Sequence, residues 1–216
     1  MTDVLDTESP DAPDDVPPDD DAVEAPRRSR LALVVSLVVA VVLVAFIGVL
    51  ATREPATDRQ VDSPLIGRAA PAIEGRTLDG GTFDLDHHLG RWVVVNFFAT
   101  WCRECRIEHP ELAGLARDHA ETGDLAVVSV VFDEDPDKAR RFFEDNGGDW
   151  PVVIDDAGLA ADYGVAKVPE TYLVAPSGRV VEKLIGGVTQ AGLERIVADY
   201  EAAAAEAEAS STEATP

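Results

Sequence analysis

The chain has 216 residues, including 41 Asp or Glu and 18 Lys or Arg, so its formal net charge is −23 at pH 7. This length allows a single domain that carries extensions. The acidic balance argues against nucleic acid as a partner, because a phosphate backbone would be repelled.

An acidic segment opens the chain. Its first 26 residues hold ten Asp or Glu and no Lys or Arg, and the arginines Arg27, Arg28 and Arg30 complete it. A segment of this composition buries too little apolar surface to order itself. We therefore expect residues 1–30 to form an acidic, disordered cytoplasmic tail with a basic end.

An apolar run follows at residues 31–50, which read LALVVSLVVAVVLVAFIGVL and carry no charge. A helix of this length, at about 1.5 Å per residue, spans roughly the 30 Å of a bilayer's hydrocarbon core. A cleaved signal peptide is the competing interpretation, but its apolar part is shorter, about 7–15 residues, and ends at a small-x-small site. Because Ala51-Thr52-Arg53 is a poor cleavage site, we expect a single uncleaved transmembrane helix.

Arginines on either side of this run predict its orientation. Three lie directly before it, Arg27, Arg28 and Arg30, whereas Arg53 and Arg59 follow it. Positive charge is retained on the cytoplasmic side of a membrane. We therefore expect a single-pass protein of a bacterial cell membrane with its N-terminus in the cytoplasm. The rest of the chain would lie outside the cytoplasm, where disulfides persist.

Composition distinguishes three further regions. Residues 51–68 are expected to be a polar linker, and residues 69–200 a globular domain. Residues 201–216 are rich in Ala and Glu and then in Ser and Thr. They are expected to continue the last helix of the domain and then to fray.

Within the domain, strand and helix patterns alternate. The apolar runs WVVVNFF and LAVVSVVF are typical of buried central strands, and Asp79-Gly80-Gly81 indicates a hairpin turn. This order predicts an α/β fold with a mixed central sheet and helices on both faces. The expected elements are a hairpin at 77–85, strand 92–98, a helix at 103–119 kinked by Pro110, strand 125–132, helix 136–146, strand 151–154, helix 159–163, strands 170–175 and 179–184, and a helix from 190 capped by Thr189.

The only two cysteines stand as Cys102-Arg103-Glu104-Cys105, directly after a buried strand and at the start of a helix. A helix N-terminus favours thiolate over thiol, so we expect Cys102 to be the nucleophile. Cys105, one turn later, can close a disulfide with Cys102 and resolve a mixed disulfide. The histidines do not complete a zinc-site spacing with this pair, so no metal is expected. The sequence also lacks a Gly-rich phosphate loop, and no organic cofactor is expected.

Three stretches carry a family resemblance: VVVNFFATWC, WCRECRIEHP and KVPETYLVAPSGRVVEKLIGG. Through the extended pattern C-x-x-C-x-x-E-x-P, the chain resembles the TlpA/ResA/CcmG group of membrane-tethered thiol oxidoreductases. The resemblance covers about residues 65–200. It implies a thioredoxin-like fold behind a single transmembrane helix, with a helix–strand unit inserted at about 136–154.

Glu108 is the catalytic residue that the resemblance adds to the two cysteines. It lies three positions after Cys105, on nearly the same helix face. Spacing alone fits an ordinary exposed helical residue as well. The resemblance implies instead that Glu108 lies near the cysteines, tunes their protonation and takes the proton of Cys105 during exchange. The neighbouring His109 is expected to be an exposed helical residue.

Four residues are expected to bind substrate. The resemblance implies that Pro169 forms a cis peptide bond and packs against the cysteines, which leaves the backbone of Val168 free to pair with a substrate chain. Glu170 follows, as in the Pro-Glu-Thr of cytochrome c maturation members, and is expected to contact substrate. Trp101 is expected to shield the edge of the disulfide and to offer a flat contact surface. The alternatives are a trans Pro169 at a strand start and a core position for Trp101.

The expected function is reduction of protein disulfides, with the haem-site cysteines of apocytochrome c as the family's usual substrate. A reductant needs electrons, so the resemblance also implies a membrane thiol carrier of the CcdA/DsbD type as a partner. The domain is expected to be a monomer.

Three other functions are compatible with parts of this pattern. An oxidant that introduces disulfides into exported proteins stays open, because Arg103 and Glu104 have opposing effects on the thiolate and do not fix the reduction potential. A peroxidase fits less well, since it requires Thr where Ala99 stands. A Sco-like copper-binding protein also fits less well, since that group uses C-x-x-x-C with a distant His.

Overall fold

The computed structural model describes residues 30–51 and 59–213, which fall in two compact units divided between Glu54 and Pro55. The first unit contains helix α1 (Arg30–Ala51), and side-chain exposure is described for its residues 33–46. Across the described residues, the structure holds no helix that is both long and apolar enough to cross a membrane. The anchor expected at 31–50 stays a prediction. The tail expected at 1–30 lies, except for its last residue, outside the described residues.

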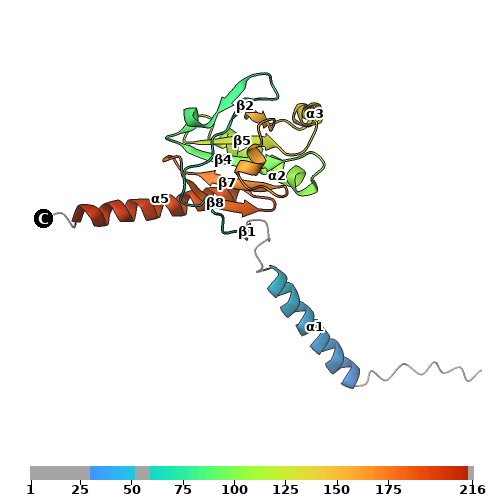
Figure 1. Ribbon diagram of the computed structural model, residues 1–216. Coiled ribbons are helices and arrows are strands. Elements are labelled where there is room, and N and C mark those ends of the chain that lie inside the picture. The colour runs from blue at the N-terminus through green and yellow to red at the C-terminus, as the bar shows by residue number, and fades with distance from the viewer. Residues whose placement is uncertain (1–29, 52–58, 214–216) are drawn as a thin grey trace, which may run out of the picture. The chain divides into compact units, whose positions relative to one another are not determined.

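A six-stranded sheet with the strand order β1-β8-β7-β4-β5-β6 forms the centre of the second unit (Figure 1). Strands β4, β5 and β6 run parallel, whereas β7 is antiparallel to β4, β8 to β7 and β1 to β8. Strands β2 and β3 form a separate hairpin. This mixed sheet confirms the expected α/β class. The strands are β1 (Arg59–Gln60), β2 (Glu74–Arg76), β3 (Thr82–Asp84), β4 (Trp92–Phe98), β5 (Leu125–Val131), β6 (Val152–Ile154), β7 (Glu170–Val174) and β8 (Val180–Ile185).

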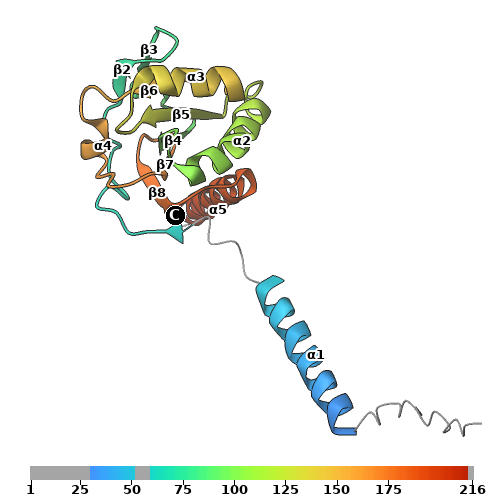
Figure 2. The same cartoon turned by 90° about the vertical axis from the view of Figure 1, so that its right-hand side faces the viewer.

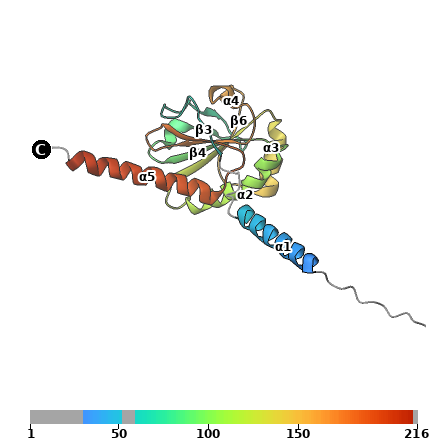
Figure 3. The same cartoon turned by 90° about the horizontal axis from the view of Figure 1, so that it is seen from below.

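Helices cover both faces of the sheet (Figures 2 and 3). One face carries the apolar side of α2 (Arg103–Asp118), α3 (Pro136–Asn146) and α5 (Gln190–Glu213). The other face carries α4 (Leu159–Asp162), the short 3-10 helix η1 (Leu85–His88) and the β2–β3 hairpin. The expected cap of the last helix is confirmed, since Thr189 Oγ1 accepts a hydrogen bond from the Gly192 N–H at 3.1 Å.

Successive side chains of β4 point to opposite faces of the sheet, so this fully buried strand contributes to the core on both faces. Val93 and Val95 belong to the apolar cluster on the α4 side, whereas Val94 and Phe98 belong to the cluster on the α2 side. Asn96 falls in the second series. A polar side chain is thereby placed in the core directly under α2.

Part of the linker expected at 51–68 belongs to the domain instead. Strand β1 pairs with β8, and the Gly67 N–H donates a hydrogen bond to the Val180 carbonyl at 2.8 Å. Without β1, that edge of β8 would expose a row of unpaired N–H and C=O groups. The domain therefore begins near residue 59 rather than 69. At the other end, α5 continues to Glu213.

Candidate active site

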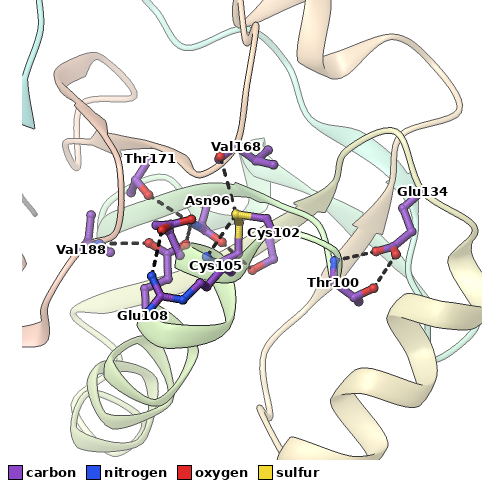
Figure 4. Close-up of a disulfide and its surroundings, with 12 residues drawn as sticks. Asn96, Thr100, Cys102, Cys105, Glu108, Glu134, Val168, Thr171 and Val188 are labelled. Atoms are coloured by element: carbon purple, nitrogen blue, oxygen red, sulfur yellow. Dashed lines mark hydrogen bonds and ion pairs between the residues drawn. A yellow bond between two sulfur atoms is a disulfide. The ribbon is translucent and has the colours of Figure 1, made fainter.

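The two cysteines lie where β4 passes into α2. The Cys102 N–H donates to the Ala99 carbonyl at 3.1 Å, which closes a tight turn after the strand. Cys102 is the N-cap of α2, and its sulfur accepts a hydrogen bond from the Cys105 N–H at 3.2 Å. The two residues form a disulfide with a Cα–Cα distance of 5.3 Å (Figure 4). The expected position of Cys102 at a helix N-terminus is confirmed, and this position stabilises a thiolate.

Glu108 lies one turn further along α2 and is only 2% exposed. Its Oε1 accepts a hydrogen bond from Asn96 Nδ2 at 2.9 Å, and its Oε2 accepts one from the Val188 N–H at 2.9 Å (Figure 4). Burial raises the pKa of this carboxyl to about 7, although the hydrogen bonds from Asn96 and Val188 oppose the rise. The structure thus places Glu108 inside the protein on the cysteine side of α2. It is not an ordinary exposed helical residue.

Val168 and Pro169 approach the disulfide from the other side. Their peptide bond is cis, as the resemblance implied. The Val168 carbonyl oxygen lies 3.6 Å from Cys102 Sγ (Figure 4). Trp101, one position before the nucleophile, is 60% exposed and is therefore not a core aromatic. An exposed Trp101 therefore precedes Cys102 in the chain, and the half-buried Val168 lies beside the sulfur on which a substrate would act.

Glu170 does not lie on this surface. It is buried, and its Oε2 lies 2.8 Å from Lys183 Nζ in an ion pair between neighbouring strands β7 and β8. The direct substrate contact expected for Glu170 does not fit this placement. Its carboxylate is committed to the interior of the sheet, where a buried charge requires a partner.

His109 is also not where it was expected. It is buried, its Nε2 lies 2.8 Å from the Gly147 carbonyl, and its ring packs against Phe142, Phe143 and Trp150. The expectation of an exposed residue was wrong because the inserted α3 covers this second side of α2. Burial lowers the pKa of His109.

Sequence reasoning missed three residues near the cysteines. Asn96 had a signal, since it is the one polar residue in the apolar run WVVVNFF. Thr100 and Glu134 had none, because their contact joins the loops after β4 and β5. The Glu134 carboxylate accepts hydrogen bonds from both the backbone N–H and the hydroxyl of Thr100 (Figure 4). Within the described residues, no group of three or more His, Cys, Asp or Glu side chains is arranged to hold a metal ion.

Comparisons with known proteins agree with this geometry. The model of the AhpC/TSA family matches residues 66–183. The chain is 35% identical over 130 residues to the thiol:disulfide interchange protein HelX of Rhodobacter capsulatus, a match that covers 58% of this chain and 71% of the relative. It is 32% identical over 130 residues to the thiol-disulfide oxidoreductase ResA of Bacillus thuringiensis, covering 60% and 75% of the two chains.

Solved structures give the same result. A thiol:disulfide interchange protein of the thioredoxin family from Chlorobium tepidum TLS matches with a TM-score of 0.57 and 26% identity, over 63% of this chain and 97% of that chain. A second structure from Chlorobium tepidum, described as a putative thiol:disulfide interchange protein DsbE, matches with a TM-score of 0.55 and 25% identity, over 60% of this chain and 94% of that chain. The thioredoxin-like fold is thereby shown, whereas the roles of the individual site residues stay predictions.

Proposed function

Because this chain belongs to the AhpC/TSA family and is a thiol–disulfide oxidoreductase with a thioredoxin-like fold, we propose that it works as a reductant of protein disulfides outside the cytoplasm. The proposal extends to cytochrome c maturation, with the haem-site cysteines of apocytochrome c as substrate. The observation that carries it is the buried carboxylate of Glu108, one helical turn from Cys105.

The reaction would proceed in two exchange steps. In the reduced protein, the Cys102 thiolate attacks one sulfur of the substrate disulfide, and the other substrate sulfur leaves as a thiolate. Cys105 then gives its proton to Glu108 and attacks Cys102 Sγ, which breaks the mixed disulfide and releases the second substrate thiolate. The electron pair passes from the cysteine pair to the substrate. The product is the Cys102–Cys105 disulfide that the structure contains.

Glu108 bears on both the rate and the direction of electron flow. A base beside the buried resolving cysteine accelerates exchange in either direction, so it sets the rate. A carboxylate in a site of low polarity also disfavours a permanently ionised thiolate nearby. Strong oxidants such as DsbA depend on a highly stabilised reduced form, whereas a carboxylate at Glu108 opposes the thiolate that the helix N-terminus favours.

The geometry around Cys102 supports a protein substrate. The Val168 carbonyl lies beside the sulfur, Val168 is half-buried, and Ala166 and Lys167 before it are exposed, which would let an extended chain pair with this segment. Trp101, the residue before Cys102, exposes a large apolar side chain. Both features suit a cysteine carried on a peptide segment better than a small disulfide.

The proposed location rests on the sequence. The uncharged run at 31–50 would anchor the chain, and Arg27, Arg28 and Arg30 would keep its N-terminus in the cytoplasm. The large apolar side chains of α1 are exposed over residues 33–46, which suits a lipid environment. A reductant in this location would receive electrons from a membrane thiol carrier of the CcdA/DsbD type.

A deletion strain tests the proposed function. Loss of the gene should lower covalently attached c-type haem on a stained gel, and the wild-type gene should restore it, whereas a C102S or C105S gene should not. Added dithiothreitol should rescue the deletion if the missing activity is reduction. An unchanged haem stain would rule out the cytochrome c role, and rescue by cystine instead would indicate an oxidant.

Membrane fractionation tests the anchor. The full-length protein should stay in the membrane pellet after alkaline carbonate extraction, and a variant that lacks residues 31–50 should not. Protease added to intact spheroplasts should degrade the domain if it lies outside. A protected domain would contradict the proposed orientation.

A further inference from the structure

A row of buried hydrogen bonds crosses the sheet and ends on Glu108. The Trp150 indole Nε1–H donates to Ser129 Oγ at 2.9 Å, and Ser129 Oγ lies 3.4 Å from Asn96 Oδ1, a long hydrogen bond. Asn96 Nδ2 donates to Glu108 Oε1 at 2.9 Å and to Thr171 Oγ1 at 3.1 Å. The contacts link the segment before β6 to the active site through residues of β5 and β4.

The chemistry of Trp150 fixes the direction of the first bond in this row, and the contact between Ser129 and Asn96 carries that order on to the Asn96 amide. An indole N–H is a donor only, so Ser129 Oγ must accept at that contact. The single hydroxyl hydrogen of Ser129 is then free for the Asn96 carbonyl oxygen. With its oxygen held by Ser129, the Asn96 amide directs its two N–H groups at the remaining acceptors, Glu108 and Thr171.

The opposite orientation of the Asn96 amide would reverse the effect on Glu108. An amide oxygen facing Glu108 would repel the carboxylate and accept the proton of the neutral acid. An N–H facing Glu108 instead stabilises the carboxylate form. The orientation of the Asn96 amide therefore determines whether Asn96 favours the carboxylate form or the neutral form of Glu108.

We propose that Trp150, Ser129 and Asn96 act in series as positioning residues, which turn an amide N–H onto Glu108 and keep its carboxylate form accessible to the resolving cysteine. The proposal deepens the function proposed above and rests on the role of Glu108 as the proton acceptor. It also gives the inserted segment between α3 and β6 a role in the reaction, because that segment supplies Trp150.

The groups that face Glu108 come from four elements. Asn96 reaches it from β4 and the Val188 N–H from the loop after β8. Thr171 of β7 accepts the second N–H of Asn96, and the disulfide of Cys102 and Cys105 lies at the start of α2. Among the described residues, no Lys, Arg or His forms an ion pair with Glu108. The amide of Asn96 is therefore the main polar side chain that sets its ionisation.

The test is a titration of Glu108 in the oxidised, full-length protein, where the closed disulfide removes both cysteines from the titration. The carboxyl signal would be followed by ¹³C NMR and assigned by its loss in E108Q. The variants are W150F, S129A and N96A. The matched control is W92F, because the Trp92 indole N–H also bonds a side chain, Glu201, at 2.9 Å but lies outside the row.

The proposal predicts a graded rise in the pKa of Glu108. N96A should raise it by about one pH unit, because a hydrogen bond to the charged form is lost. W150F and S129A should raise it by less, and W92F should leave it unchanged. S129A is the smallest change, so it keeps the test valid if W150F does not fold.

The outcomes separate the inference from the proposed function. An unchanged pKa of Glu108 in N96A, or in both W150F and S129A, would overturn the inference. A raised pKa with the matching shift in the pH profile of disulfide exchange supports both. A raised pKa with an unshifted profile supports the positioning role and overturns the role of Glu108 as proton acceptor.

Discussion

The Glu134 carboxylate holds Thr100 by two hydrogen bonds, from the backbone N–H at 2.7 Å and from the hydroxyl, two positions before Cys102. Thr100 and Trp101 form the corner of the turn that delivers the nucleophile to α2. Asp133, next to Glu134, has φ 43°, a left-handed conformation that residues other than Gly rarely adopt. The loop after β5 is thus bent to reach the turn after β4.

The first prediction concerns the two hydrogen bonds between Thr100 and Glu134. Glu134→Ala should destabilise the oxidised protein by about 1–2 kcal/mol in urea unfolding, because Thr100 loses both hydrogen bonds to Glu134. The mutation should also slow exchange with a protein disulfide, since the turn that carries Trp101 and Cys102 is released. Glu144→Ala, at an exposed position on α3, is the control and should change neither quantity. Equal effects of the two variants would contradict a role of these hydrogen bonds in positioning the turn.

The second prediction concerns pH and Glu108, whose pKa is raised from its ordinary 4.5 to about 7. Below pH 4.5 the carboxyl is protonated in both the folded and unfolded states. As pH rises from there to about 7, the unfolded state releases this proton first, so stability falls by roughly 3 kcal/mol. The Glu108→Gln variant has no carboxyl that titrates at this position, so it does not lose stability in this way. Its stability relative to wild type should therefore rise between pH 4.5 and 8.

Urea unfolding at a series of pH values measures that difference. Glu104→Gln, at an exposed position on the same helix, is the control and should give a flat difference. A flat difference for Glu108→Gln as well would show that the carboxyl is ionised normally in the folded protein.

The third prediction concerns the buried pair of Glu170 and Lys183, whose side chains are 3% and 11% exposed. Lys183→Met should cost about 3–5 kcal/mol, because it leaves a buried carboxylate without its cation. The double variant with Glu170→Gln should recover most of that loss. Arg76→Met, in an exposed pair with Asp156, should cost less than about 1 kcal/mol. A double variant as unstable as Lys183→Met would contradict this account.

The fourth prediction concerns Trp101. Trp101→Ala should lower kcat/KM for a protein disulfide about tenfold, since an exposed Trp next to the nucleophile in the chain is a typical contact hot spot. The rate with a small disulfide such as oxidised glutathione should change less than about twofold, because that substrate has little surface to bury against the indole. Leu89→Ala, another exposed apolar residue, should have no effect on either substrate. An equal loss for both substrates would indicate a change at the cysteines instead.

The elements that could be predicted from sequence are those with local signals. The apolar run of β4 and the Asp135-Pro136 start of α3 lie at their predicted bounds, whereas the hairpin expected at 77–85 begins three residues earlier, at Glu74. The cysteine pair could be assigned for the same reason, because its chemistry depends on a strand-to-helix junction that the sequence marks.

What could not be predicted depends on contacts between distant segments. Strand β1 has two residues and exists because β8 offers an edge. His109 is buried because α3 packs over it, and Glu170 is buried because Lys183 lies on the neighbouring strand. The hydrogen bonds that Thr100 donates to Glu134 and that Ser129 donates to Asn96 likewise join residues that are more than 30 positions apart.

The reduction potential of the full-length protein tests the central claim, that this oxidoreductase works as a reductant. The protein would be equilibrated with dithiothreitol or glutathione buffers, and the free thiols of Cys102 and Cys105 would be counted by alkylation. We predict a value near or below about −220 mV, in the range from glutaredoxins to thioredoxin. A value near about −120 mV, as for DsbA, would contradict the claim and make the protein a disulfide donor.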